Sequence, residues 1–350
     1  MIDRRTFVGG GIALGTASPL FARKTDADRI AALVPAAFSG IVLRARLGRT
    51  VFVRSYGYAD LTTRHPVRET TRFAFGSGSK WLTSVAVLKL VEAGTLDLDR
   101  PLIAYLTDLR ADAAGLVTLR HLLSNTSGIP DLMSRALGKE PELRRSTATA
   151  ATMVARLAGG DLAFPPGSSF DYAALNWAIV VAVIERVTGK PFATVMHDIV
   201  YAPLRLRTVV NANAGFAAVP DMAHAYRSGE PPVEKMTPVP AFVAASGNVV
   251  GTAQDAMRAA HGIFATGFLS AASRRTLTTV RWPAEEYALG GRIHALGGGH
   301  WAWEAGKVEG YRALVAQNLA QDETIVVFNN TDLPQATLAT LVEGIATGRA

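Results

Sequence analysis

Alternating apolar and polar residues occur at both ends of the chain, and this pattern constrains the fold more than any other feature. Residues 38–60, FSGIVLRARLGRTVFVRSYGYAD, alternate on either side of a glycine turn and predict a β-hairpin. Residues 292–330 alternate in the same way and predict three antiparallel strands, followed by a last helix at about 334–347. Most of the sequence between the two ends reads as helix. Strands at both ends with helices between them imply that the two ends share one sheet.

The predicted architecture is therefore α+β, a mixed arrangement in which an antiparallel sheet is flanked by terminal helices and carries an inserted, mainly helical domain. We place the sheet-containing domain at 28–85 and 241–348, and the helical domain at 86–240. A chain of 350 residues, 49% of them hydrophobic, can bury cores of this size. A buried helix is predicted at 175–188, where glycine and then proline stop it. Residues 211–240 lack periodicity and predict a long loop region.

The first 22 residues predict a twin-arginine export signal. Arg4 and Arg5 precede Phe7, a weakly apolar glycine-rich run and then small residues. A glycine-rich nucleotide-binding loop is excluded here, because no strand precedes the glycines and the GxGxxG spacing is absent. We therefore expect a periplasmic or secreted protein. The sequence contains no cysteine, so disulfides, thiol catalysis and a lipid anchor on cysteine are excluded.

The charge and hydropathy patterns do not favour nucleic acid or membrane as a partner. The formal net charge is +7, but the basic residues are scattered and are not interleaved with aromatic ones, as they would be in a nucleic-acid-binding surface. Beyond the signal, the apolar run at 177–187 has the length of a core helix rather than of a membrane span. No stable membrane insertion is therefore expected after removal of the signal.

The stretch from 73 to 99, FAFGSGSKWLTSVAVLKLVEAGTLDLD, contains an unusual helix start. Ser77 is predicted at the N-cap of an almost wholly apolar helix, yet the residue three positions later is Lys80, where glutamate or glutamine would suit the helix dipole. Burial lowers the pKa of a lysine by about 3 to 5 units, and a neutral amine one turn from a serine hydroxyl can act as its general base. The same spacing fits a capping serine and a lysine that reaches solvent, so this motif alone leaves both interpretations open.

Several stretches, in the same order, resemble the landmarks of the serine β-lactamase and penicillin-binding-protein superfamily. They are the stretch just described, LRHLLSNTSGIPDL, FPPGSSFDYAALNWAIVVAVIERVTGKPF, VYAPLRLRTV and AASGNVVGTAQDAM. The resemblance covers residues 28–347 and is nearest to the branch of class C β-lactamases, D-alanyl-D-alanine carboxypeptidases and related esterases. It implies that Ser77 is the nucleophile, that Lys80 is its partner, and that Tyr172 is the second acid/base group. Ser79 is a bystander by the same analogy.

The third motif of this superfamily, usually Lys-Thr-Gly or His-x-Gly, falls on Glu304-Ala305-Gly306. By resemblance, Gly306 lets the substrate approach the backbone, and the N–H of Lys307 forms the oxyanion hole together with the N–H of the nucleophile. Glu304 replaces a cation that in β-lactamases helps to hold the substrate carboxylate. A carboxylate there repels such a substrate and raises the pKa of the tyrosine, unless Lys307 or Arg312 pairs with it.

A second departure is Ala174, which stands where the Tyr-x-Asn motif has asparagine and so removes a side-chain donor. The resemblance implies a serine hydrolase that forms an acyl-enzyme on ester or amide substrates, peptides and β-lactams included. The substitution at Glu304 favours neutral substrates or substrates with an amino group over those with a carboxylate. The alternative is a catalytically weakened protein that binds peptidoglycan-like or peptide ligands without turnover.

The remaining candidates have structural interpretations. No cofactor and no metal are implied, since neither His294 nor His300 has the company of other metal ligands. His121 lies among leucines and is predicted to make a structural contact. The aromatic residues on the predicted C-terminal strands fit either a pocket wall or core packing; they are Trp301, Trp303 and Tyr311. The expected partner is a small-molecule or peptide substrate.

Overall fold

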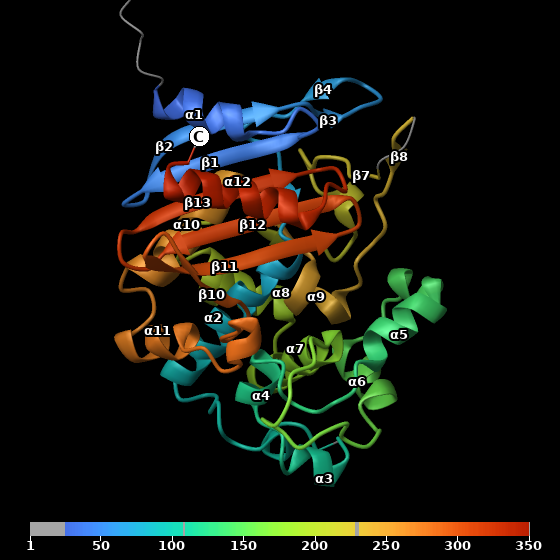
Figure 1. Cartoon of the computed structure of the whole chain (residues 1–350). Coiled ribbons are helices and arrows are strands. Elements are labelled where there is room, and N and C mark those ends of the chain that lie inside the picture. The colour runs from blue at the N-terminus through green and yellow to red at the C-terminus, as the bar shows by residue number, and fades with distance from the viewer. Residues whose placement is uncertain (1–24, 108, 228–230, 350) are drawn as a thin grey trace, which may run out of the picture.

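The computed structural model describes residues 25–107, 109–227 and 231–349, so the predicted export signal at 1–22 lies outside the described residues. Its largest sheet has six antiparallel strands in the order β10-β11-β12-β13-β1-β2 (Figure 1). The strands are β1 (Gly40–Arg46), β2 (Arg49–Tyr56), β10 (Arg292–Leu296), β11 (Gly299–Val308), β12 (Tyr311–Asn318) and β13 (Glu323–Asn329). β1 pairs with β13, with Gly40 opposite Asn329. The prediction that the two ends of the chain share one sheet is thus confirmed.

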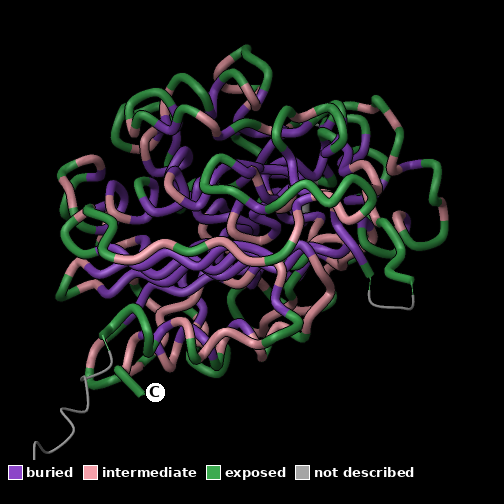
Figure 2. Tube along the Cα trace, turned by 90° about the horizontal axis from the view of Figure 1, so that it is seen from above, coloured by how far each residue is buried: buried purple, intermediate pink, exposed green. Residues whose placement is uncertain are grey.

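Helices cover both faces of this sheet. α1 (Asp26–Leu33) and α12 (Gln335–Thr347) pack on one face, and α10 (Ala253–Ala265) packs on the other. Since the central strands are covered on both sides, every residue of β12 and β13 is buried. Figure 2 shows these strands as a buried layer with exposed loops around it. The α+β architecture predicted from the sequence is confirmed.

A mainly helical part lies beside the sheet, below it in Figure 1. Its central helix is α7 (Ala174–Thr188), which is buried from Leu175 to Ile184 and ends at Gly189 with φ of 66°; the helix predicted at 175–188 is confirmed. The other helices are α2 (Ser79–Glu92), α3 (Ala111–Ala114), α4 (Leu119–Leu123), α5 (Leu132–Lys139), α6 (Ala150–Leu157), α8 (Phe192–Met196), α9 (Ala244–Gly247) and α11 (Ala271–Thr278). Over the described ranges, no helix combines the length and apolarity needed to cross a membrane.

The predicted number of C-terminal strands needs correction. Residues 292–330 form four strands rather than three, because a turn at Glu309-Gly310 separates β11 from β12. Glu309 has φ of 47°, and a Cβ added to Gly310 would lie 2.5 Å from the carbonyl oxygen of Tyr226. The alternation of apolar and polar residues runs through this turn, so periodicity alone does not reveal it.

The segment 211–240, predicted as a long loop region, contains the short paired strands β7 (Tyr226–Arg227) and β8 (Val233–Glu234). The other short strands also lie outside the large sheet. They are β3 (Tyr58–Asp60), β4 (His65–Pro66), β5 (Phe73–Ala74), β6 (Val210–Asn211) and β9 (Val249–Gly251).

Candidate active site

Ser77 lies in a single 3-10 turn, η1 (Gly76–Gly78), between β5 and α2. The helix starts at Ser79, and its N-cap residue Gly78 makes no side-chain cap. The predicted N-cap position of Ser77 is therefore corrected, because the 3-10 turn moves the helix start past it, and the capping interpretation of the motif falls away. Ser79 is buried, and its Oγ accepts a hydrogen bond of 3.2 Å from the N–H of Val249, so Ser79 has a structural contact of its own.

Lys80 is almost completely buried in the first turn of α2. Its Nζ donates to Ser77 Oγ at 3.0 Å and to the carbonyl oxygen of Ser246 at 3.2 Å. Burial lowers the pKa of Lys80 from its ordinary 10.5 to about 8, although the carboxyl of Glu304 acts in the opposite direction. The amine is thus held against the serine hydroxyl, and a minor fraction of it is neutral at physiological pH.

Tyr172 immediately precedes the turn into α7, and its hydroxyl donates to Ser77 Oγ at 2.9 Å. The Nζ of Lys80 lies 4.7 Å from the centroid of the Tyr172 ring. Burial, and then the carboxyl of Glu304, raise the pKa of Tyr172 well above its usual 10. The hydroxyl itself is buried against Ser77, but the residue as a whole keeps 40% of its surface exposed, so solvent reaches the edge of this cluster.

Gly306 and Lys307 lie on β11 where this strand touches the η1 turn. A Cβ added to Gly306 would lie 2.0 Å from the carbonyl oxygen of Phe75, and one added to Gly76 would lie 2.8 Å from the N of Lys307. Only glycine permits this approach of two backbones. Trp303 is the last residue of β11 that pairs with β10. The part of β11 around Gly306 therefore has no β10 residue beside it. The structure therefore brings the N–H of Lys307 next to the turn that holds Ser77.

Glu304 lies near enough to the cluster for its carboxyl to affect the pKa values of Lys80 and Tyr172, but its side chain has no exposed surface. Neither carboxyl oxygen has a hydrogen-bond partner among the described residues. Burial raises the pKa of Glu304 to about 8, although the charges of Lys80 and Arg292 lower it. A protonated, neutral Glu304 neither raises the pKa of Tyr172 nor repels an anion, which softens the departure from the superfamily motif at neutral pH.

Besides Lys80, Glu304 has a second cation beside it, which the sequence motifs did not indicate. Arg292 Nη1 lies 4.0 Å from Glu304 Oε2. Lys307, by contrast, is exposed, and the guanidinium of Arg312 donates to the carbonyl oxygens of Leu333, Glu309 and Tyr311. The predicted pairing of Glu304 with Lys307 or Arg312 is thus wrong, because a neighbouring strand supplies the charge. The sequence feature that could have drawn attention to this segment is the dipeptide Gly290-Gly291 directly before Arg292, because glycine permits a close approach of two backbones.

The loss of asparagine at Ala174 leaves the start of α7 without that donor. Asn176 is buried and is bonded to Ser127 and Asn125, so it supports the loop and does not substitute for the missing side chain. The carboxyl of Asp131 accepts a hydrogen bond of 3.3 Å from the N–H of Leu175. The charge of Asp131 also raises the pKa of Lys80, which makes Asp131 a second residue near the site that the motifs did not reveal.

The other candidate residues lie outside this cluster. Trp301 and Trp303 pack in the core on the opposite face of the sheet, and Tyr311 donates to the carbonyl oxygen of Ala223. His121 forms a capping box with Thr118 and is a structural contact, as predicted. Within the described part of the chain, no three histidine, aspartate or glutamate side chains are grouped as metal ligands.

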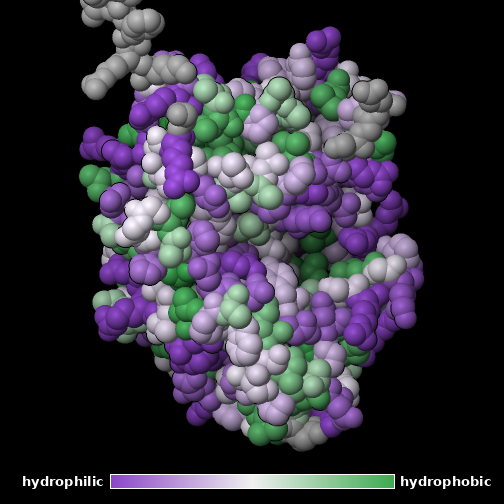
Figure 3. All heavy atoms as spheres, in the orientation of Figure 1, coloured by the Kyte–Doolittle hydropathy of each residue, from purple (hydrophilic) through white to green (hydrophobic). Residues whose placement is uncertain are grey.

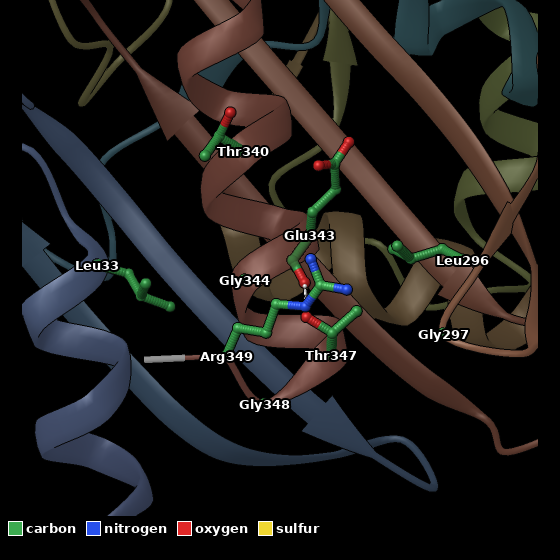
Figure 4. Close-up of a pocket in the computed structure, with 9 residues that line it drawn as sticks. All are labelled: Leu33, Leu296, Gly297, Thr340, Glu343, Gly344, Thr347, Gly348 and Arg349. Atoms are coloured by element: carbon green, nitrogen blue, oxygen red, sulfur yellow. Dashed lines mark hydrogen bonds between the residues drawn. The ribbon is translucent and has the colours of Figure 1, made fainter.

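A cavity of about 590 Å³ lies elsewhere, between α1, α12 and the turn from β10 to β11 (Figure 4). Its lining includes Leu33, Leu296, Thr340, Glu343 and Arg349, without a serine, lysine or tyrosine. Figure 3 shows that the surface is also hollowed between the sheet and the helices. The chemistry assigns the candidate site to the Ser77 cluster rather than to this cavity.

Comparison with known proteins supplies the family. A family model described as Beta-lactamase matches residues 28–346. The chain belongs to the beta-lactamase family. It is 30% identical to Esterase EstB of Burkholderia gladioli over 292 residues, which cover 70% of this chain and 73% of the esterase. The resemblance drawn from the motifs is confirmed, and the chain is a serine hydrolase of this family.

Several solved structures share the fold of this chain. A penicillin binding protein from Bacillus halodurans has a TM-score of 0.80 at 24% identity, and the match covers 93% of this chain and 100% of that one. A D-stereospecific amidohydrolase from Streptomyces sp. has a TM-score of 0.78 at 23% identity, with 93% and 98% of the two chains covered. At these identities the likeness concerns the architecture rather than the substrate.

Proposed function

We propose that this beta-lactamase-family protein hydrolyses esters or amides through an acyl-enzyme on Ser77. The observation that carries the proposal is the position of Ser77 Oγ between Lys80 Nζ at 3.0 Å and Tyr172 OH at 2.9 Å. The name of the esterase relative supports ester substrates, and the name of the amidohydrolase neighbour extends the class to amides.

Lys80 is the general base in this proposal. Its pKa of about 8 leaves roughly a tenth of the amine neutral at pH 7, and this fraction takes the hydroxyl proton as Ser77 attacks the carbonyl carbon. The pKa of Tyr172 is raised, so Tyr172 keeps its proton. It is therefore a donor, which gives its proton to the leaving alcohol or amine and regains one from the Lys80 ammonium.

The negative oxygen of the tetrahedral intermediate needs donors of its own. The N–H groups of Ser77 and Lys307 supply them in this proposal, supported by the contact between the η1 turn and Gly306. Each such donor contributes about 10² to 10³ in rate. Because these are backbone groups, they survive the replacement of the usual motif by Glu304-Ala305-Gly306. Water then attacks the acyl-enzyme, and Lys80 accepts a proton from this water. Lys80 returns the proton to Ser77 Oγ as the bond between the acyl carbon and Ser77 breaks, which releases the carboxylic acid and the free serine.

The proposed place of action is outside the cytoplasm. This stays a prediction from the arginine pair and the glycine-rich run at residues 1–22.

The test compares wild type with Ser77→Ala on p-nitrophenyl butyrate and on a fluorophosphonate probe. Wild type should turn over the ester and gain the mass of the probe at Ser77, and Ser77→Ala should do neither. If wild type releases p-nitrophenol no faster than Ser77→Ala and gains no mass, hydrolysis is ruled out, and the binding-protein alternative explains the family membership better.

A further inference from the structure

The side chain of Tyr172 receives little support from its own segment of the chain. Residues 171–173 belong to no helix or strand, and 40% of the surface of Tyr172 is exposed. Its hydroxyl nevertheless lies 2.9 Å from Ser77 Oγ, within hydrogen-bond distance. Holding an exposed side chain in one rotamer costs conformational entropy, so neighbouring groups have to fix the ring of Tyr172 in this position.

Two groups contact the ring of Tyr172. The Nζ of Lys80 lies 4.7 Å from its centroid. The ring of Tyr287 meets it edge-on, with the two centroids 6.0 Å apart and the two planes at 89°. Aromatic pairs prefer this arrangement, because the positive edge of one ring faces the negative face of the other. Lys80 is the general base of the proposed reaction, whereas Tyr287 takes no part in it.

Tyr287 is itself held firmly. It has no exposed surface, and its ring also contacts the ring of Phe170, with centroids 5.3 Å apart, and the guanidinium of Arg292, whose carbon lies 5.3 Å from the centroid. The N–H of Tyr287 donates to the carbonyl oxygen of Trp282 at 3.1 Å, and its carbonyl oxygen accepts from the N–H of Trp282 at 3.1 Å. Both the backbone and the ring of Tyr287 are thus fixed.

The segment that follows Tyr287 rests on α2, the helix that carries Lys80. A Cβ added to Gly290, which has φ of 78°, would lie 2.7 Å from the carbonyl oxygen of Lys80. A Cβ added to Gly291 would overlap the indole ring of Trp81. Only glycine permits so close an approach. The two groups that contact the Tyr172 ring are therefore held in place relative to each other.

We propose that Tyr287 is a positioning residue for Tyr172: its buried ring holds the Tyr172 ring at the angle from which the hydroxyl reaches Ser77 and the leaving group. This inference rests on the proposed hydrolase function and adds a residue to it. Because Tyr287 has no exposed surface, it acts through Tyr172 and not on the substrate. The contact between the two residues is made by their rings, so a phenylalanine at position 287 would preserve it.

This role predicts which substrates depend most on Tyr287. In the proposed function Tyr172 gives its proton to the leaving group, and such general acid catalysis matters most where the leaving group is a strong base. Phenol has the hydroxyl of a tyrosine side chain and titrates at about 10, whereas p-nitrophenol is a stronger acid because its nitro group delocalises the charge of the anion. A misplaced Tyr172 should therefore slow the hydrolysis of a phenyl ester more than that of a p-nitrophenyl ester.

The test measures kcat/KM per folded molecule for phenyl butyrate and for p-nitrophenyl butyrate, which share one acyl group. The readout is the ratio of the first value to the second. Tyr287→Leu removes the ring, and its ratio should be more than about threefold below that of wild type, since general acid catalysis contributes about 10² to 10⁴ in rate. Tyr287→Phe keeps the ring and should keep the wild-type ratio. Tyr201→Leu, at a buried tyrosine whose hydroxyl donates to Asn211, is the matched control for the loss of a core ring and should also keep it.

A double-mutant cycle separates positioning from a general loss of structure. Tyr172→Phe lacks the proton donor, so the addition of Tyr287→Leu should lower its kcat/KM for phenyl butyrate by less than about twofold. If Tyr287→Leu does not fold, Tyr287→Met, with a side chain that adapts to irregular space, takes its place in both measurements. A ratio within about threefold of wild type, or an equal loss with and without the Tyr172 hydroxyl, would overturn the proposal. Absence of p-nitrophenyl butyrate turnover by wild type above Ser77→Ala would instead refute the hydrolase function itself.

Discussion

Two buried glutamates stand in the same sheet, and the surroundings of their carboxyl groups differ. Glu323, on β13, lies 2.5 Å from Arg44 Nε and 3.6 Å from Arg46 Nη2. Glu304, on β11, has no hydrogen-bond partner for either oxygen among the described residues, and Arg292 is 4.0 Å away. Both residues are at most 3% exposed, so burial alone does not distinguish them.

This difference in surroundings indicates that Glu323 has a structural role, whereas Glu304 belongs to the candidate active site. A buried carboxylate must be paired or must hold a proton, since an isolated buried charge is strongly destabilising. Glu323 is paired with arginines, whereas burial raises the pKa of Glu304 to about 8. Retention of a buried acid that has no hydrogen-bond partner and that interacts electrostatically with Lys80 is typical of a functional site, where perturbed pKa values cluster.

The largest effect is expected on catalysis, in the cluster that contains Glu304 and Lys80. Lys80→Met removes the general base and should lower kcat/KM for p-nitrophenyl butyrate by about 10³-fold or more. Lys89→Met, in the same helix and in a partly exposed pair with Glu92, is the matched control and should keep its activity. Activity of Lys80→Met within tenfold of wild type would show that another group activates Ser77.

The second-largest effect is expected on the free energy of unfolding, at the ion pair of Glu323 with Arg44. Arg44→Met leaves the buried Glu323 with only the more distant Arg46, and should lower the free energy of unfolding by about 3–5 kcal/mol. Urea denaturation measures this change. The rate per folded molecule should stay as in wild type, because Arg44 has no contact with the Ser77 cluster. A loss below about 1 kcal/mol would mean that the pairing of Glu323 contributes little and that the contrast with Glu304 fails.

The third prediction concerns how the free energy of unfolding depends on pH. Glu304 is faced by Lys80 from α2, by Arg292 from β10, and by Tyr172 and Tyr287. Because its pKa is raised from 4.5 to about 8 in the folded protein, the fold holds a proton that the unfolded chain releases. The resulting stabilisation is complete below pH 4.5 and is lost as pH rises from 4.5 through 8, by at most about 5 kcal/mol.

Lys80 has the opposite sign, since its folded pKa of about 8 lies below 10.5, and the penalty for its burial is relieved between pH 8 and 10.5. We therefore expect a stability minimum near pH 8, measured by urea denaturation at a series of pH values. Glu304→Gln should remove the fall between pH 5 and 8, and Glu343→Gln on α12 should leave it in place. A fall that persists in Glu304→Gln would assign it to another group.

The same comparison shows what the sequence could and could not predict. Ser77, Lys80 and Tyr172 were found because each belongs to a local motif, and alternation of apolar and polar residues predicted that both ends of the chain share a sheet. The partner of Glu304 could not be found in this way. Lys307 and Arg312 are close to Glu304 in sequence, but Arg292 reaches it across the pairing of β10 with β11, and such register is a property of the folded sheet.

The smallest expected effect is on the pH dependence of the rate. If neutral Lys80 is the base, kcat/KM for p-nitrophenyl butyrate should rise with pH and level off above about 8.

The carboxyl of Glu304 raises the pKa of Lys80, and Arg292 lowers it. Glu304→Gln removes the first influence, so its midpoint should move to lower pH, by less than about one unit because Glu304 is partly protonated in this range. Glu343→Gln serves as the control. A midpoint that moves upward, or does not move, would show that the charge of Glu304 does not reach the base, and the unpaired glutamate would then need an explanation other than tuning of Lys80.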